Sequence, residues 1–430
     1  MTSGSSVSDR SRFCDGRQPP RYRLLDVTRR FAATKLKEAN ETERLQLRHG
    51  QAFASLADIA VARFEEMSDA AWLSAYAVNY DDWRVAFAQA CERRDAEVAS
   101  STGAALCCLD RLRDTSAGVR SRMKAAFALL PTASPIARAS LWGIVAGAFA
   151  IAIPEVSRLD TYRAEAAAWS EVGHRPNQCQ ALWTLARELA QREEWEAVDR
   201  VVEEARRLEE TGWTLRQRLW PAIVSNHVSS LRGDLAGYSE RWQGVLKLAQ
   251  LAGADKLAAW SQLDHAGDAL QAGDVSKAVS LGQLADAEMR RLNLPSGQMW
   301  ARVHLCAAHV MNGELAPACA AARGALSMAQ MFDGGGWRAE FFNYLALLAT
   351  RAGQPRGGAM LLGFAAARFA AVGDLPSRTE RQMLRVASEE LSVRLVSEEI
   401  ASLRALGAQL TIQQAEELAD GLLTITSVQD

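Results

Sequence analysis

Long apolar runs are missing from this sequence, and with them the usual signs of a membrane-spanning or exported protein. The most apolar window, Leu141 to Ile153, is 13 residues long and contains two glycines, whereas a membrane-spanning helix needs about 20 apolar residues. The N-terminal stretch MTSGSSVSDRSRFCDG has no apolar segment of the kind that signal peptides carry. We therefore expect a cytoplasmic protein in which Leu141 to Ile153 forms a buried helix.

Cysteine and histidine patterns that bind metals are missing as well. The sequence has no CxxC and no HExxH motif, and its cysteines are odd in number, which is typical of reduced, mostly buried thiols. His304 and His309 are five residues apart and so lie on different faces of a helix, which disfavours a shared metal. We predict no metal site. The seven cysteines are Cys14, Cys91, Cys107, Cys108, Cys179, Cys306 and Cys319.

Catalytic motifs are equally scarce. There is no GxxxxGK[ST] phosphate loop and no GxSxG elbow, and the run Gly334 to Gly336 falls where a loop between repeats is expected. The most polar cluster in an expected helix is Asp264, His265 and Asp268. Because His265 and Asp268 are one turn apart, we interpret them as a local surface pair, with a catalytic or sensing site as the alternative. The main prediction is a protein that is not an enzyme and needs no cofactor.

Proline and charge of one sign are also sparse. Only 11 prolines occur, and the composition is rich in Ala, Leu, Arg and Glu, which favours helices. The formal net charge is −2, so no overall field attracts nucleic acid or membranes. The charge is uneven, because residues 1–48 contain eleven Arg or Lys and six Asp or Glu. We interpret this excess as a solvated basic tail and helix face; the alternative is a docking surface for a DNA-binding or nucleotide-binding neighbour.

What the sequence does contain is a repeat of 40 residues. Gly233, Gly273, Gly313 and Gly353 are each 40 apart and predict a tight turn between two helices, and extrapolating backward places Glu193 and Ile153 at the same position. The pattern predicts an all-α, TPR-like helical-repeat solenoid of about six helix pairs. The other markers in this register are Gly173, Gly253, Asn293, Asp333 and Gly373 at the ends of helix pairs, and Ala205, Val245, Ala285, Ala325 and Ala365 in the second helices.

Helices are expected on both sides of the repeats. We predict a disordered tail at residues 1–20, a smaller helical region at 21–130, the repeats at 138–377 and a helical cap at 378–430. In the cap, Thr411 is expected to begin a helix from Gln413 to Leu422, with Gln414 in the capping-box position. The helices expected in the first region cover about Asp26–Leu36, Glu43–Glu66, Ala70–Tyr76, Asp81–Arg93, Ala96–Leu112 and Ala117–Leu129.

Three tryptophans, Trp220, Trp260 and Trp300, form a stripe along successive first helices of the repeats. Because flat rings bury a large area, we favour packing at each joint between repeats. The alternative is an aromatic ladder on a concave surface that anchors a peptide or effector. Together with Asp264 and His304, these residues are the candidate partner groove.

The N-terminal part resembles a known family. Residues 21–32 read RYRLLDVTRRFA, residues 48–57 read RHGQAFASLA, and Trp72 and the segment 79–90 follow. This succession resembles the segment behind the nucleotide-binding module of bacterial transcriptional regulators with STAND-type ATPase cores, where it closes a winged-helix subdomain. The segments 361–365 and 414–419 resemble that family's repeat and C-terminal signatures, so the resemblance covers about residues 20–425.

The resemblance implies a regulatory region without the ATPase domain that accompanies it in the family. The family's DNA-binding domain and P-loop ATPase have no counterpart in this sequence, so we expect neither direct nucleic-acid binding nor ATP hydrolysis. The leading hypothesis is a non-catalytic interaction module that binds a protein, peptide or small effector in transcriptional control, with a separate ATPase or transcription factor as the candidate partner. The alternatives are a free-standing TPR-like scaffold unrelated to transcription and a helical enzyme built on Asp264, His265 and Asp268. No membrane partner is expected.

Overall fold

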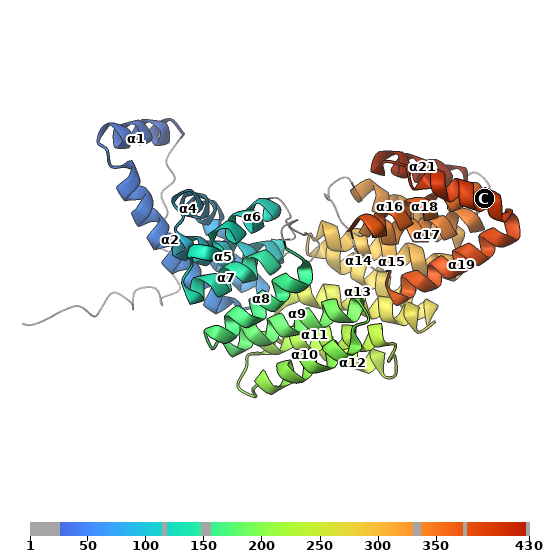
Figure 1. Cartoon of the computed structure of the whole chain (residues 1–430), viewed down its shortest axis with the longest axis horizontal. Helices are drawn as coiled ribbons and strands as arrows, with labels where there is room; N and C mark the ends of the chain where they lie inside the picture. Colours follow the sequence, from blue (N-terminus) through green and yellow to red (C-terminus); the bar gives the residue numbers. More distant parts are fainter. Residues whose placement is uncertain (1–25, 114–117, 148–155, 330–336, 373–375, 427–430) are drawn as a thin grey trace, which may run out of the picture.

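The computed structural model describes residues 26–113, 118–147, 156–329, 337–372 and 376–426, and these are built almost entirely of α-helices. Figure 1 shows an elongated array with the N-terminal helices at one end and the C-terminal helices at the other. The predicted all-α repeat fold is confirmed. In the part that the structure describes, no helix is long and apolar enough to cross a membrane. The predicted tail at 1–20, Cys14 and the loop at Gly334 to Gly336 lie outside the described residues.

The N-terminal helices begin and end close to the predicted positions. Trp72 and Trp83 are fully buried, and their indole N–H groups donate to the backbone carbonyls of Ala60 (2.7 Å) and Phe53 (3.2 Å). Because each ring's one polar atom is satisfied, both rings pack in the core and fix α3 and α4 on α2. The helices are α1 (Asp26–Glu38), α2 (Thr42–Phe64), α3 (Asp69–Tyr76), α4 (Tyr80–Arg93), α5 (Ala96–Arg113) and α6 (Val119–Leu129), with short 3₁₀ helices η1 (Ala77–Asn79) and η2 (Leu130–Thr132).

Helix pairs follow in the predicted 40-residue register. In α7, Leu141, Ile144 and Val145 are buried, as predicted for this apolar window, and residues 148–155 lie outside the described ranges. The pairs are α7 (Pro135–Ala146) with α8 (Arg158–Glu171), α9 (Arg175–Gln191) with α10 (Trp195–Leu208), α11 (Leu215–Arg232) with α12 (Tyr238–Leu251), α13 (Asp255–Gln271) with α14 (Val275–Arg291), α15 (Pro295–Met311) with α16 (Leu315–Ala329), and α17 (Trp337–Arg351) with α18 (Pro355–Val372).

The turns inside the pairs use the left-handed backbone conformation. Gly233, Gly273, Gly313 and Gly353 have φ values of 87°, 82°, 77° and 83°. The equivalent turn between α9 and α10 holds Glu193, with φ at 60°. A residue with a Cβ atom costs about 1–2 kcal/mol in this conformation, so four of these turns are relaxed and the one at Glu193 is strained.

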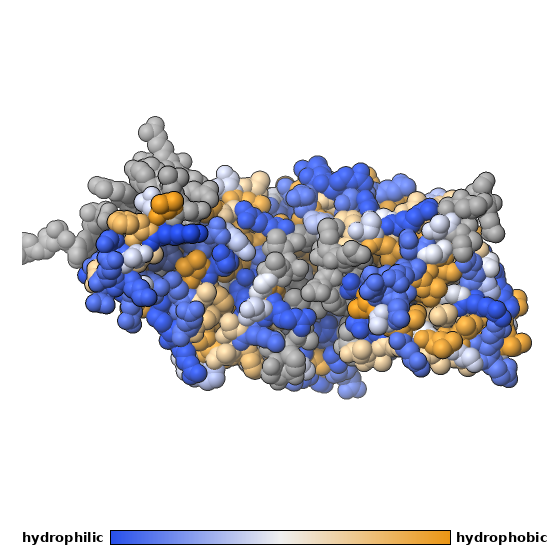
Figure 2. Space-filling view, turned by 90° about the horizontal axis from the view of Figure 1, so that it is seen from above, coloured by the Kyte–Doolittle hydropathy of each residue, from blue (hydrophilic) through white to orange (hydrophobic). Residues whose placement is uncertain are grey.

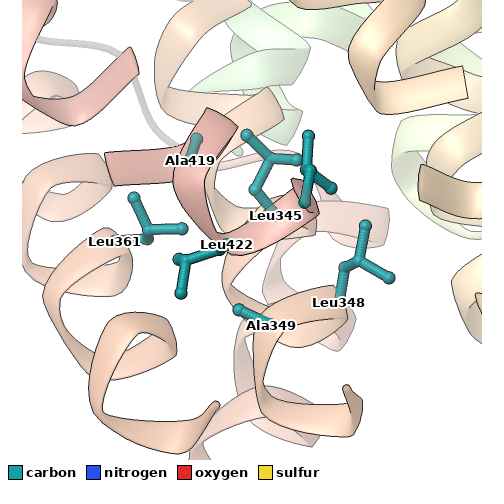
Figure 3. A pocket seen from close by; sticks show the side chains of 7 residues that line it. Leu345, Leu348, Ala349, Leu361, Ala419 and Leu422 are labelled. Carbon is teal, nitrogen blue, oxygen red and sulfur yellow. The ribbon is translucent and has the colours of Figure 1, made fainter. Parts of the chain in front are cut away.

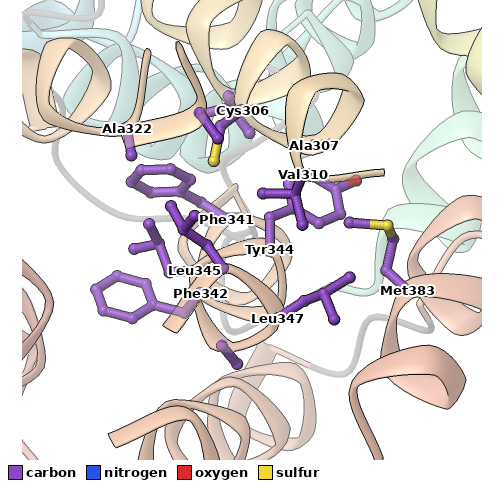
Figure 4. Packing of buried hydrophobic residues seen from close by; sticks show 14 of the residues in the cluster. Cys306, Ala307, Val310, Ala322, Phe341, Phe342, Tyr344, Leu345, Leu347 and Met383 are labelled. Carbon is purple, nitrogen blue, oxygen red and sulfur yellow. The ribbon is translucent and has the colours of Figure 1, made fainter. Parts of the chain in front are cut away.

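Three helices follow the last pair and pack on α16, α17 and α18: α19 (Arg378–Arg394), α20 (Ser397–Gly407) and α21 (Ile412–Thr426). The predicted capping box is confirmed, since the Thr411 N–H donates to Gln414 Oε1 (2.9 Å) and the Gln414 N–H donates to Thr411 Oγ1 (3.2 Å). The largest hydrophobic core of the described residues lies here. Figure 4 shows Phe341 and Phe342 close together in this core, with Cys306 near Phe341 and Met383 on the opposite side of the cluster.

Two glycines bring α18 and α20 into backbone contact. A Cβ atom added to Gly363 would overlap the carbonyl oxygen of Arg404, and one added to Gly407 would overlap the carbonyl oxygen of Met360. Each glycine therefore lies where the opposite helix leaves no room for a side chain. The two helices pack as closely as their backbones allow.

The start of α3 and the residue Met67 before it dock on the repeats. Asp69 accepts a hydrogen bond from Arg216 Nη2 (2.5 Å) and one from the backbone N–H of Lys256 (3.0 Å). Arg216 also donates to the carbonyl of Met67 (3.2 Å) and lies 4.7 Å from the ring centre of Phe64. The Asp69 and Arg216 side chains are 9% and 5% exposed, so this ion pair is buried between the N-terminal helices and the starts of α11 and α13.

The cysteines of the described residues are free, and most are buried, in agreement with the prediction. Burial raises the pKa of the Cys108 and Cys179 thiols to about 12. Both thiols are therefore protonated at neutral pH and poor nucleophiles.

Candidate functional site

The first helices of successive pairs, α9, α11, α13, α15 and α17, place a row of side chains next to one another. The 40-residue period puts equivalent residues at equivalent positions of these helices. The row includes all five residues that the sequence suggested for a partner groove. We call it the first-helix strip, and its members are Thr184, Trp220, His227, Trp260, Asp264, Trp300, His304 and Glu340. Thr184 is buried, and the other members are half-buried.

The tryptophans of the strip pack at the joints between pairs and keep part of each ring accessible. Trp220 contacts two neighbouring hydrophobic clusters, and its indole N–H donates to Thr184 Oγ1 on the preceding first helix (3.1 Å). Trp260 and Trp300 likewise each contact two clusters. The rings therefore help to hold successive pairs together, and their accessible edges form part of the surface of the strip.

The polar residues of α13 have separate partners. His265 and Asp268 are only 3% and 7% exposed, so the predicted surface pair between them is wrong. Asp268 accepts hydrogen bonds from Ser230 Oγ (2.5 Å) and Trp242 Nε1 (2.6 Å), whereas His265 Nε2 lies 3.2 Å from Ser239 Oγ. The reason is that neighbouring helices cover α13 on more than one side, so side chains one turn apart reach different helices.

Burial explains the ionisation of these two side chains. It lowers the pKa of His265 to about 4, with Lys277 adding to the effect, so the imidazole is neutral at pH 7. Burial also raises the pKa of Asp268, and the hydrogen bonds from Ser230 and Trp242 act against that rise. Both groups serve as internal hydrogen-bonding partners between helices, and Asp264, His265 and Asp268 do not converge on one point.

Ionisable side chains of the strip are paired across the joints. His227 Nε2 lies 3.0 Å from Asp264 Oδ2, between α11 and α13, and His304 Nε2 lies 3.7 Å from Glu340 Oε1, between α15 and α17. Burial would raise the pKa of Asp264, but His227, Arg187 and His304 outweigh it, so the pKa lies below its ordinary value. The Asp264 carboxylate is therefore charged at neutral pH in a half-buried position.

The α17 end of the strip lies close to α19. Glu340 accepts a hydrogen bond from the Tyr344 hydroxyl (2.7 Å). Burial, followed by the nearby Glu340 carboxylate, raises the pKa of Glu380 well above its ordinary range. Glu380 belongs to α19 and is 5% exposed. The last member of the strip is thus close to a buried carboxyl group on a helix outside the six pairs.

The described residues contain no group of three or more His, Cys, Asp or Glu side chains that could hold a metal ion. A cavity between α17, α18 and α21 is lined only by Leu and Ala side chains (Figure 3). Its free volume of about 10 Å³ is room for at most about one water molecule, and the apolar lining offers such a water no hydrogen bond.

The sequence pattern did not identify His227 and Glu340, the partners of Asp264 and His304. Asp264 and His304 lie four positions after Trp260 and Trp300, whereas His227 lies seven positions after Trp220. Positions four and seven residues further along a helix share one face with the starting residue. Looking for ionisable residues four and seven positions after each of these tryptophans would have identified His227 as well.

Comparisons with known proteins give matches of structure only. No protein-family model matches the chain, and no curated protein matches it. Among solved structures, the chain is similar to a Rap protein complexed with competence and sporulation factor, at 11% identity and a TM-score of 0.46, covering 76% of this chain and 98% of that chain. It is also similar to the apo form of RapI, at 12% identity and a TM-score of 0.40, covering 73% of this chain and 96% of that chain.

Proposed function

We propose that the protein is a non-catalytic interaction module whose first-helix strip binds a peptide or protein partner. The observation that carries this proposal is the row of half-buried aromatic and ionisable side chains along α11, α13, α15 and α17. Such a row offers a partner both apolar contact and charged hydrogen-bonding groups, which is the usual composition of an interface. In the view from above, hydrophobic and hydrophilic side chains are interspersed, apart from the grey atoms (Figure 2).

Affinity capture tests this proposal. The full chain is immobilised and exposed to lysate of its own cells, and captured proteins are quantified by mass spectrometry. Asp264→Asn and Glu340→Gln keep the shape of the strip and remove its charge. Because a hydrogen bond to a charged group contributes about 1.5–3 kcal/mol, each substitution should reduce capture of the partner about tenfold or more.

The control makes the same kind of substitution, carboxylate to amide, on α10, which is the second helix of its pair. Glu196→Gln and Glu204→Gln change exposed carboxylates of α10 and should leave capture unchanged. If these variants lost the partner as strongly as the strip variants, or if the strip variants kept it, the strip would not be the binding surface.

We further propose that the partner acts in transcriptional control and includes a separate ATPase. This proposal is supported by the resemblance at residues 21–32 and by the accessible apolar face of α1, which projects from the body and touches α2 (Figure 1). Val27 and Phe31 on this helix are 80% and 62% exposed. Apolar side chains this accessible on a projecting helix are typical of a docking surface.

Replacing both apolar residues of α1 tests the second proposal. A variant with Val27→Ser and Phe31→Ser should lose at least about tenfold in co-purification with an ATPase encoded next to this chain, because buried apolar anchors dominate interface energies. Leu284→Ser removes a leucine that is 59% exposed on α14 and should have no effect. If the ATPase co-purified equally with the unmodified chain, the α1 double variant and the Leu284 variant, α1 would not be the docking surface.

A further inference from the structure

One contact joins parts of the repeat array that are far apart in sequence. Arg381 Nη2 on α19 lies 2.6 Å from Glu193 Oε1 in the turn between α9 and α10, across 188 residues. In a helical repeat each pair ordinarily contacts only its neighbours. The helix α19 also contacts α13 and α17, and in Figure 1 it runs back from the C-terminal helices toward α13. It therefore reaches the turn that follows α9 as well as α17, at the two ends of the first-helix strip.

The backbone at Glu193 indicates that this contact has a purpose. The equivalent turns hold Gly233, Gly273, Gly313 and Gly353, which adopt the left-handed conformation without strain. Glu193 adopts the same conformation with a φ of 60°, although a side chain disfavours it. Glycine would relax the turn but would remove the carboxylate that meets Arg381. The strained residue of this set of turns is thus the one that supplies a long-range contact, and strain of this kind clusters at functional positions.

The exposure of the pair indicates that the contact is reversible. The Arg381 and Glu193 side chains are 44% and 51% exposed, and exposed ion pairs add little to stability. Arg381 Nη1 also donates to the carbonyl of Pro376 (3.1 Å), which orients its guanidinium. By contrast, the pair of Asp69 with Arg216 is buried. The buried pair fixes the N-terminal helices, whereas the exposed pair is weak enough to open.

We propose that Glu193 and Arg381 form a reversible latch that holds α19 against the turn between α9 and α10 and so controls access of a partner to the first-helix strip. The gating role rests on the proposed function of the strip, and the latch itself does not. With the latch closed, α19 bridges the strip from its α9 end to Glu340 at its α17 end. With the latch open, the first turn of α19 is free to leave the turn at Glu193, while Met383 and Leu391 keep the rest of α19 in the core.

Amide hydrogen exchange of the full chain tests the latch without any partner. Glu193→Gln and Arg381→Gln each remove one charge of the pair and should speed exchange in the first turns of α19 about fivefold, the upper range for an exposed pair. Salt at 0.5 M should have a similar effect on the unmodified chain, because it screens exposed charges. A double variant with Glu193→Arg and Arg381→Glu should restore slow exchange.

Asn293→Gly is the matched control, because Asn293 occupies another left-handed turn of the repeat, with a φ of 54°. It should leave exchange in α19 unchanged. Unchanged exchange in the Glu193 and Arg381 variants, or no rescue by the charge-reversed pair, would overturn the latch. Failure of the strip is distinguished from failure of the latch, because the exchange experiment contains no partner and the Asp264 and Glu340 variants leave both latch residues unchanged.

Discussion

The variant Asp69→Ala is expected to lower the free energy of unfolding by about 3–5 kcal/mol, because it leaves a buried charge without its partner. Arg216 would keep only the carbonyl of Met67 as a hydrogen-bond acceptor among the contacts described above, and the Lys256 N–H would lose its acceptor. Urea unfolding at pH 7, followed by circular dichroism, measures this change. The loss is a large fraction of the stability of an ordinary domain.

An exposed ion pair provides the control for this prediction. Asp199 lies 2.6 Å from Arg232, and their side chains are 64% and 43% exposed. Asp199→Ala should therefore cost about 0–1 kcal/mol. Equal, small losses for Asp69→Ala and Asp199→Ala would mean that the N-terminal helices do not depend on the buried pair for their position on the repeats.

Gly363→Ala should have the second largest effect, a loss of about 1–3 kcal/mol or more. The added methyl group would overlap the carbonyl oxygen of Arg404, so α18 and α20 would have to separate. Gly244→Ala is the matched control, because this exposed glycine lies inside α12 and an added Cβ atom meets no neighbour. That substitution should instead stabilise the protein by about 0.5–1 kcal/mol, since alanine favours helices over glycine.

Thermal unfolding of the two glycine variants distinguishes packing from helix propensity. Propensity alone would raise the melting temperature of both variants, whereas the backbone contact predicts opposite signs. A higher melting temperature for Gly363→Ala would show that α18 and α20 do not pack through their backbones.

Features that repeat along the chain could be predicted from the sequence. The glycines at 233, 273, 313 and 353 indicated the turns because their left-handed conformation excludes most other residues. The spacing of Trp220, Trp260 and Trp300 placed them on equivalent faces of successive helices. In both cases one local physical requirement recurs at a fixed interval, so the interval itself reveals it.

Features that occur once could not be predicted in this way. Asp69 and Arg216 are 147 residues apart, and Glu193 and Arg381 are 188 apart, so neither pair leaves a periodic signal. The surface pair expected for His265 and Asp268 was wrong for a related reason. Helical spacing places two side chains near each other, but only the packing of α11 and α12 on α13 decides which partners they bind.

The central claim is that a partner binds along the first-helix strip, and hydrogen exchange of the captured complex tests it most directly. Comparing the complex with the free chain maps the amides that the partner protects. We predict protection in α11, α13 and α15, around Trp220, Asp264 and His304. Protection confined to the second helices α10, α12 and α14, with none in the first helices, would contradict it.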